Sequence, residues 1–218
     1  MHIARIMKRL SLLLMMTLPS QILGADVSIT VLDKQGKPLE DIVVYITGEN
    51  LMNDYQPQEV AIYQEDKKFT PYITVKTPQD RLVFENKDTI SHHVFTVLSR
   101  ELDFRLKRSE RVSDQNITRL GDALLACNIH DWMAGYVFTV NTPLHGKTDS
   151  KGTLMLTIPD EGQFTAIVWH PQLDDADQSQ AQTFLVKETS ALTFQLTKDM
   201  AEIPTQDSEE IFDFLDDY

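Results

Sequence analysis

Three side chains with metal-binding chemistry lie close together in the sequence. Cys127, His130 and Met133 stand at C-x2-H-x2-M spacing and offer a thiol, an imidazole and a thioether. A strand that runs to Cys127, followed by a tight loop, would turn all three toward one point. A second imidazole has to come from elsewhere, and His92 or His93, at the mouth of an upstream strand, can supply it. Two imidazoles, a thiolate and a distant thioether make the trigonal site with a weak axial ligand that copper uses in electron transfer.

Zinc binding, apolar packing and redox sensing account for less of this pattern than copper does. Zinc accepts two imidazoles and a thiolate but gains nothing from a thioether. A buried cysteine can act as a small apolar side chain, and a redox-sensing thiol would lack a resolving cysteine, because Cys127 is the only cysteine of the chain. The same count excludes an intramolecular disulfide, a Cys-rich zinc site and a dinuclear thiolate-bridged copper centre. The sequence therefore predicts one mononuclear copper ion per chain, bound less tightly as the pH falls.

The elements that must hold these side chains are short β-strands. Apolar and polar residues alternate in short runs that are separated by turn residues. No long stretch shows a convincing helical period, so the predicted fold class is all-β. Strands are predicted over residues 27–31, 42–46, 72–75, 82–84, 94–97, 102–106, 123–127, 136–140, 154–158, 164–169, 183–186 and 192–196.

The N-terminal segment, residues 1–25, has the pattern of a secretory signal peptide. Three basic residues precede an apolar run over residues 10–18, and small residues follow up to Ala25. The apolar run is too short to span a bilayer. We expect cleavage after Ala25, which removes three basic residues and changes the net charge from -13 to -16. The mature chain is predicted to be periplasmic, with no membrane span.

The acidic charge restricts the partners. It argues against general binding of nucleic acid, because a chain with an excess of negative charge cannot take the place of the cations that neutralise the phosphate backbone. It predicts instead a salt-sensitive encounter with a basic redox partner. Residues 199–218 contain eight acidic residues and no basic one, which indicates a disordered acidic tail. Apolar residues interleaved with these charges leave a short docking motif as the alternative.

The residues around the candidate site resemble the cupredoxins, the blue copper family. The loop Cys127-Asn128-Ile129-His130-Asp131-Trp132-Met133 is similar to the ligand loop of amicyanin. The resemblance covers about residues 61–140, and this stretch also resembles cupredoxin-like proteins labelled methylamine utilization protein. It implies a Greek-key β-sandwich with His92, Cys127, His130 and Met133 as copper ligands.

Two features depart from this pattern. The glycine-containing turn usual before the strand of Asn86 is replaced by Pro78-Gln79-Asp80, and the ligand motif carries a second histidine. Amicyanin-like sequences have His-Asn-Val where this chain has His92-His93-Val94. We favour His92 as the ligand, because the motif aligns there and strand alternation then sends His93 to the opposite face.

A second β-sandwich is predicted from the residues on either side. Residues 26–46 and the turns at 148–164 resemble a transthyretin-like or carboxypeptidase-regulatory-like sandwich. We expect a cupredoxin-like domain over 57–142 to interrupt a discontinuous domain made of 26–56 and 143–198. Two separate β units in sequence order are the alternative. His145 and His170 belong to this second unit and are predicted to be surface or turn residues.

The sequence thus predicts an exported mononuclear type 1 (blue) copper protein that transfers single electrons between a donor and an acceptor protein. No substrate pocket is implied, so it is not expected to be an enzyme. A periplasmic copper-binding or copper-delivery protein without a redox role and a non-metal β-sandwich interaction module are the alternatives. Trp132, between two of the ligands, is predicted to contact the partner or, alternatively, to belong to the core.

Overall fold

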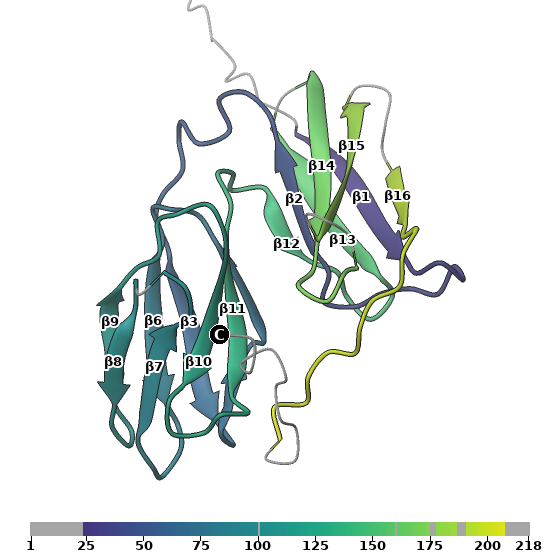
Figure 1. Ribbon diagram of the computed structural model, residues 1–218. Helices are drawn as coiled ribbons and strands as arrows, with labels where there is room; N and C mark the ends of the chain where they lie inside the picture. Colours follow the sequence, from purple (N-terminus) through teal and green to yellow (C-terminus); the bar gives the residue numbers. More distant parts are fainter. Residues whose placement is uncertain (1–23, 100, 160, 175–177, 187–190, 208–218) are drawn as a thin grey trace, which may run out of the picture.

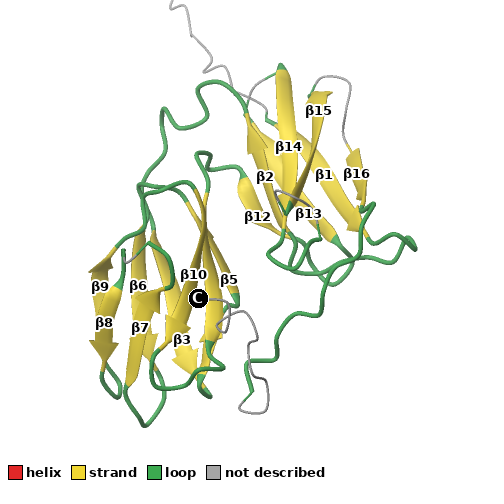
Figure 2. Cartoon of the chain, viewed as in Figure 1, coloured by secondary structure: helices red, strands yellow, loops and turns green. Residues whose placement is uncertain are grey.

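The computed structural model describes residues 24–99, 101–159, 161–174, 178–186 and 191–207, which form sixteen β-strands and no helix (Figure 2). The predicted all-β class is confirmed. Residues 1–23 of the predicted signal peptide lie outside the described residues.

Among the residues that the structure describes, there is no helix with the length and apolar character that a membrane crossing needs.

Nine consecutive strands, β3 to β11, form one two-sheet unit, here called the central unit (Figure 1). One sheet has the strand order β4-β3-β6-β9 and the other β5-β11-β10-β7-β8. The pairs β3 with β6 and β5 with β11 are parallel, and the other pairs are antiparallel. The strands are β3 Glu59–Glu65, β4 Lys68–Thr70, β5 Ile73–Lys76, β6 Arg81–Asn86, β7 His92–Thr96, β8 Asp103–Leu106, β9 Arg111–Gln115, β10 Gly121–Cys127 and β11 Ala134–Thr139.

Alternating side chains of the two sheets fill the core of the central unit. In β6, for example, Leu82 and Phe84 are fully buried and point into this core. Cys127 and Met133 belong to the same apolar cluster. The segment that joins β10 to β11 therefore begins and ends in the core, and both sulfur atoms lie on buried side chains.

The other seven strands form a second two-sheet unit, here called the flanking unit. Its sheets have the orders β13-β1-β16 and β12-β2-β14-β15. Strand β1 pairs with β13 and β16, so segments from before and after the central unit share one sheet. This pairing is what a discontinuous domain requires. The domain boundaries 26–56, 57–142 and 143–198 stay a prediction. The strands are β1 Ala25–Leu32, β2 Val43–Thr47, β12 His145–Lys147, β13 Thr153–Ile158, β14 Gln163–Trp169, β15 Ser179–Leu185 and β16 Ala191–Gln195.

A tight turn holds β13 against β1. The Asp149 carboxylate accepts hydrogen bonds from the backbone N–H groups of Lys151 and Thr153, both at 2.9 Å. Gly152 between them has a φ of +71°, and a Cβ at this position would lie 2.7 Å from the Val31 carbonyl oxygen. Only glycine fits both this backbone angle and this close approach. The turn residues of this region in the sequence therefore reflect the geometry of the turn.

An aromatic cluster joins the two units. Trp169, at the end of β14, is buried, and its ring stacks on that of Phe138 in β11, with centroids 4.0 Å apart and planes at 15°. The Tyr136 ring meets Trp169 edge-on at 6.2 Å, and the Tyr45 ring of β2 lies 5.8 Å from Phe138. Packed aromatic pairs of this kind contribute beyond the area that they bury. The units therefore share an apolar contact in addition to the chain connections.

His170 corrects part of one prediction. Predicted to be a surface or turn residue, it begins a turn, with the Leu173 N–H donating to its carbonyl oxygen at 3.0 Å, but it is fully buried. Its Nδ1 accepts a hydrogen bond from the Gln172 backbone N–H at 3.2 Å, while its Nε2 has no hydrogen-bond partner among the described residues. Burial lowers the pKa of His170 to about 4, an effect that Asp41 opposes and Lys147 reinforces. The imidazole is thus held neutral in the folded chain.

Acidification should destabilise the fold through His170. Its pKa is about 4 when folded and about 6.5 when unfolded, so the unfolded chain binds the extra proton between these values. The stability is complete above pH 6.5 and declines as the pH falls toward 4, by about 3 kcal/mol for this group. Denaturant unfolding of the wild type and of His170→Gln at several pH values measures this. Parallel pH profiles for the two proteins would refute it.

The start of the predicted acidic tail also differs from expectation. Residues 199–207 are in contact with both units: Met200 forms an isolated β-bridge with Leu173, and the Gln206 side chain is buried against Phe69. Figure 1 shows this yellow segment passing from the flanking unit to the central unit. For these nine residues the structure thus shows defined contacts where the sequence predicts disorder. Residues 208–218 lie outside the described residues.

Candidate metal centre

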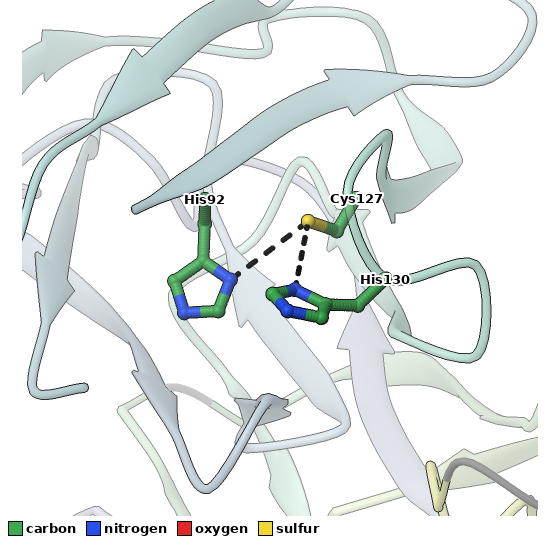
Figure 3. A group of neighbouring side chains, drawn as sticks. All are labelled: His92, Cys127 and His130. Atoms are coloured by element: carbon green, nitrogen blue, oxygen red, sulfur yellow. Dashed lines mark hydrogen bonds between the residues drawn. The ribbon is translucent and has the colours of Figure 1, made fainter. Parts of the chain in front are cut away.

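Two neighbouring strands of the central unit bring the predicted donors together. Strand β7 begins at His92 and β10 ends at Cys127, and the two strands pair antiparallel, with Cys127 opposite Val94. The start of one strand therefore lies beside the end of the other. The loop after Cys127 then carries His130 back toward the same point, as Figure 3 shows.

The donor atoms converge on one point. The Cys127 sulfur lies 3.8 Å from Nδ1 of His92 and 3.7 Å from Nδ1 of His130. One donor atom from each of the three residues lies within 4.8 Å of the others, and all three residues are buried. Nitrogen at about 2.0 Å and sulfur at about 2.3 Å from one metal, in a trigonal arrangement, would be separated by about 3.7 Å. The observed spacing therefore fits a shared metal ion.

Backbone hydrogen bonds fix the loop. The Met133 N–H donates to the His130 carbonyl oxygen at 3.0 Å, and the Asn128 N–H donates to the His93 carbonyl oxygen at 3.0 Å. Backbone N–H groups of His93, Ile129 and His130 also donate to the Cys127 sulfur. These contacts hold the sulfur in place and favour its thiolate form.

Met133, the predicted axial donor, is fully buried. It lies in the same apolar cluster as Cys127. It is followed by β11, where a Cβ on Gly135 would lie only 2.9 Å from the Cβ of Phe69. The thioether is thus enclosed by close-packed apolar groups, where a weak ligand keeps a defined position.

Strand alternation separates the two adjacent histidines. His92 is fully buried and faces Cys127, whereas His93 turns outward, with its Nε2 2.7 Å from an Asp103 carboxylate oxygen. His92, and not His93, is therefore the imidazole beside the sulfur. The backbone of His93 still contributes, through its bonds to Cys127 and Asn128.

Asp88 orients His92, a role that the sequence did not predict. Its Oδ2 lies 2.8 Å from Nε2 of His92, and its two oxygens accept backbone N–H bonds from Asp66 at 2.8 Å and Lys67 at 3.0 Å. A carboxylate on the far nitrogen fixes the ring and its tautomer and leaves Nδ1 free for a metal. The only sequence signal was an aspartate four residues before a histidine, inside a turn.

Burial and neighbouring groups shift the pKa values of the three titratable groups at the site. Burial alone would raise the pKa of the Cys127 thiol, but hydrogen bonds from His92 and the backbone lower it below its usual value. Burial alone would lower the pKa of His92, but Cys127 and Asp88 raise it. Burial, together with His92 and Lys67, lowers the pKa of His130. Without a metal, the arrangement favours a thiolate paired with His92 and a neutral imidazole at His130, and metal binding would displace the proton of His92.

Replacing Asp88 with asparagine should weaken binding of the predicted copper ion by about 10- to 100-fold. The amide nitrogen would present hydrogens to a pocket where N–H groups already point inward from Asp66 and Lys67. Competition with a copper chelator measures the affinity. Asp103→Asn is the matched control, because it alters the histidine–carboxylate pair of His93, which faces away from the sulfur. Equal affinities for the two variants would contradict the role of Asp88.

Trp132 lies at the rim of the centre. Its ring is 5.3 Å from that of His130, and it packs against the edge of the core cluster while part of it remains accessible. Ile129 and Ile90 are exposed hydrophobic residues of the central unit. Of the two imidazoles, His130 is the less enclosed, so a route from the sulfur to the surface passes through it.

Comparisons with known proteins bear on part of the chain. No protein-family model matches it. No curated protein matches it either. Among solved structures, the chain is similar to amicyanin from Paracoccus versutus, with 15% identity over 44% of this chain and 97% of amicyanin, at a TM-score of 0.33. A reduced single-residue variant of amicyanin matches with 20% identity over 44% of this chain and 98% of that one, at a TM-score of 0.34.

A larger copper protein matches as well. The Cu-containing nitrite reductase from Thermus scotoductus SA-01 has 19% identity over 39% of this chain, at a TM-score of 0.34, and the match spans only 23% of the reductase. At these values the matches describe a likeness and carry no argument about chemistry. The case for a metal site rests on the donor atoms and their spacing.

The predicted resemblance to amicyanin is confirmed over about 44% of the chain, while the label methylamine utilization protein stays a prediction. In its all-β sheets and its buried His92, Cys127 and His130, this chain resembles the cupredoxins, and amicyanin among them.

Proposed function

We propose that the protein is a mononuclear type 1 copper protein that carries single electrons between protein partners. The observation that carries this proposal is the approach of two imidazole Nδ1 atoms, from His92 and His130, to within 3.8 Å of one buried sulfur, that of Cys127. Met133 would complete the ligand set as the weak axial donor. One copper ion is proposed per chain, since the chain has one cysteine.

The donor set fits copper better than zinc. A thiolate and two neutral imidazoles suit both metals, but the thioether of Met133, the proposed axial ligand, would have value only for a soft ion. A bound copper ion would supply a one-electron couple between Cu(I) and Cu(II). The protein's part is to hold the donors in one arrangement: β7 and β10 fix His92 and Cys127, Asp88 orients the imidazole, and the apolar core excludes water.

Electron exchange is proposed to occur at the surface beside His130. Its ring and the ring of Trp132 are neighbours, and Ile129 next to it is exposed. An apolar rim of this kind lets a redox partner approach closely. We propose a donor and an acceptor protein as the partners and a carrier, not an enzyme, as the role of this chain.

The charge distribution refines the proposed partner. Residues 57–142 carry eleven basic and twelve acidic side chains, so they are nearly neutral, and the excess of acidic residues lies elsewhere in the chain. Attraction of a basic partner would therefore come mainly from the flanking unit and residues 199–218. The apolar rim would then make the short-range contact.

Two further parts of the proposal come from the sequence. The N-terminal pattern supports export to the periplasm after cleavage of residues 1–25. The motifs of residues 26–46 and 148–164 support a transthyretin-like or carboxypeptidase-regulatory-like identity for the flanking unit. Its two-sheet arrangement is compatible with that identity.

A redox titration with a chelator challenge separates a carrier from a delivery protein. The copper-loaded protein, residues 26–218, is reduced and reoxidised in the presence of a Cu(I) chelator. A carrier retains its metal through repeated one-electron cycles, because the donors are already in place and buried. Loss of the copper to the chelator in the first reduction would refute electron transfer and favour copper delivery.

A further inference from the structure

We infer that Gln206, in the segment after the last strand, is a positioning residue for the proposed copper site and acts through Phe69. The inference deepens the proposed function and rests on it. Residues 199–207 lie far from the ligands in sequence, yet they end beside β4, which packs on β11 directly after the ligand loop. Three steps connect Gln206 to Met133.

The first step is a two-bond clamp. The Gln206 amide oxygen accepts the Phe69 backbone N–H at 2.9 Å, and the Gln206 amide nitrogen donates to the Phe69 carbonyl oxygen at 3.0 Å. Gln206 is only 5% exposed. These are the two bonds that a residue on an added strand would make. The side chain therefore takes the place of a neighbouring strand at β4, which pairs, within the described ranges of the chain, with β3 alone.

The second step leads from Phe69 to the metal ligands. Phe69 is 1% exposed and belongs to the apolar cluster that contains Cys127 and Met133. Gly135, two residues after Met133, packs so closely that a Cβ there would lie 2.9 Å from the Phe69 Cβ and 3.3 Å from the Tyr72 carbonyl oxygen. Close-packed groups transmit displacements because there is no free space to absorb them.

The third step is a backbone link in the same place. The Tyr136 N–H donates to the Tyr72 carbonyl oxygen at 2.7 Å, which joins β11 to the chain just after Phe69. Whatever fixes Phe69 therefore also fixes the first residues of β11, and these hold the end of the ligand loop. The axial ligand is the donor most sensitive to such a shift, because its bond is long and weak.

The clamp is anchored from both sides. The Ala201 N–H donates to the Gln172 carbonyl oxygen at 2.9 Å in the flanking unit, and Asp207 pairs with Lys68 at 2.9 Å in the central unit. The Asp207–Lys68 pair is well exposed, so it contributes little by itself. Gln206 lies between Ala201 and Asp207 in the sequence, and its buried side chain makes the hydrogen bonds that link this segment to β4.

The test uses two Gln206 variants. Gln206→Ala removes the clamp, and Gln206→Met removes its hydrogen bonds but keeps the volume, so at least one measurement survives if the alanine variant folds poorly. Both leave a buried N–H and a buried carbonyl group unpaired at Phe69. With copper, we expect a changed ratio of the visible absorption bands and a shifted reduction potential.

A copper-free measurement accompanies these. Cys127 is 3% exposed, so a thiol reagent reaches it only when the site opens. We expect the metal-free variants to react about tenfold faster than the wild type with an aromatic disulfide reagent. Asp207→Asn and a chain that ends at Asp207 are the matched controls. Both keep Gln206 and should match the wild type.

The outcomes separate the two proposals. Wild-type spectrum, potential and thiol reactivity in both Gln206 variants would overturn the role of Gln206 and leave the copper proposal intact. A wild-type protein without a thiolate-to-copper band would overturn the proposed function. In that case the thiol reaction rate still decides whether Gln206 positions the loop: a faster rate in the variants supports it, and an unchanged rate excludes it.

Discussion

Replacing Cys127 with alanine should abolish the visible absorption of the copper-loaded protein. The thiolate is the only sulfur donor that can give an intense charge-transfer band, and the chain has no second cysteine to replace it. The backbone N–H groups of His93, Ile129 and His130 that point at the sulfur would also lose their acceptor. Visible spectra after addition of one equivalent of Cu(II) measure the effect.

The adjacent histidines provide the matched pair of variants for this experiment. His92→Ala should also lose the band, because its Nδ1 lies 3.8 Å from the sulfur. His93→Ala should keep it, because the His93 imidazole faces Asp103 on the other side of the strand. A band that survives in Cys127→Ala, or that is lost in His93→Ala and kept in His92→Ala, would contradict the assignment.

Replacing Trp169 with alanine should destabilise the whole protein by about 3 to 5 kcal/mol. Trp169 is 2% exposed, and its ring stacks on Phe138 of the central unit at 4.0 Å. Its removal leaves a cavity between the two units and takes away the aromatic contacts with Phe138 and Tyr136. Denaturant unfolding measures the loss.

The remaining tryptophan makes this experiment specific. In Trp169→Ala, fluorescence comes from Trp132 alone, which is in the central unit. A lower unfolding midpoint at Trp132 would show that the contact stabilises the central unit too. Leu185→Ala, at an exposed position of β15, is the control and should change little. A loss below about 1 kcal/mol in Trp169→Ala, or the same loss in the control, would contradict the proposed coupling.

The sequence was most informative where the structure depends on local pattern. Short apolar or alternating runs between turn residues predicted twelve of the strands, because the apolar side chains of such runs are buried in a core. This pattern missed β9, whose Arg111–Gln115 sequence is largely polar, and the three-residue strands β4 and β12. It also missed β3, Glu59–Glu65, where the apolar residues are consecutive and no alternation appears. Strands of this kind form because adjacent strands of the sheet pair with them, and their own residue pattern does not reveal them.

At the site, too, local patterns could be predicted and contacts between distant segments could not. The spacing of Cys127, His130 and Met133 is local and could be read directly, and alternation separated His92 from His93. Asp88 could not be found in this way, because its role depends on a turn that folds back on His92. The contact of Gln206 with Phe69 spans 137 residues, and only the folded chain reveals it.

The visible spectrum of the wild-type protein tests the central claim most directly. Residues 26–218 are prepared without metal, titrated with Cu(II) and followed by absorption. We expect one intense thiolate-to-copper band that saturates at one copper per chain, since Cys127 is the sole thiolate and two imidazole nitrogens already face it. The absence of such a band, or saturation at another stoichiometry, would contradict the claim.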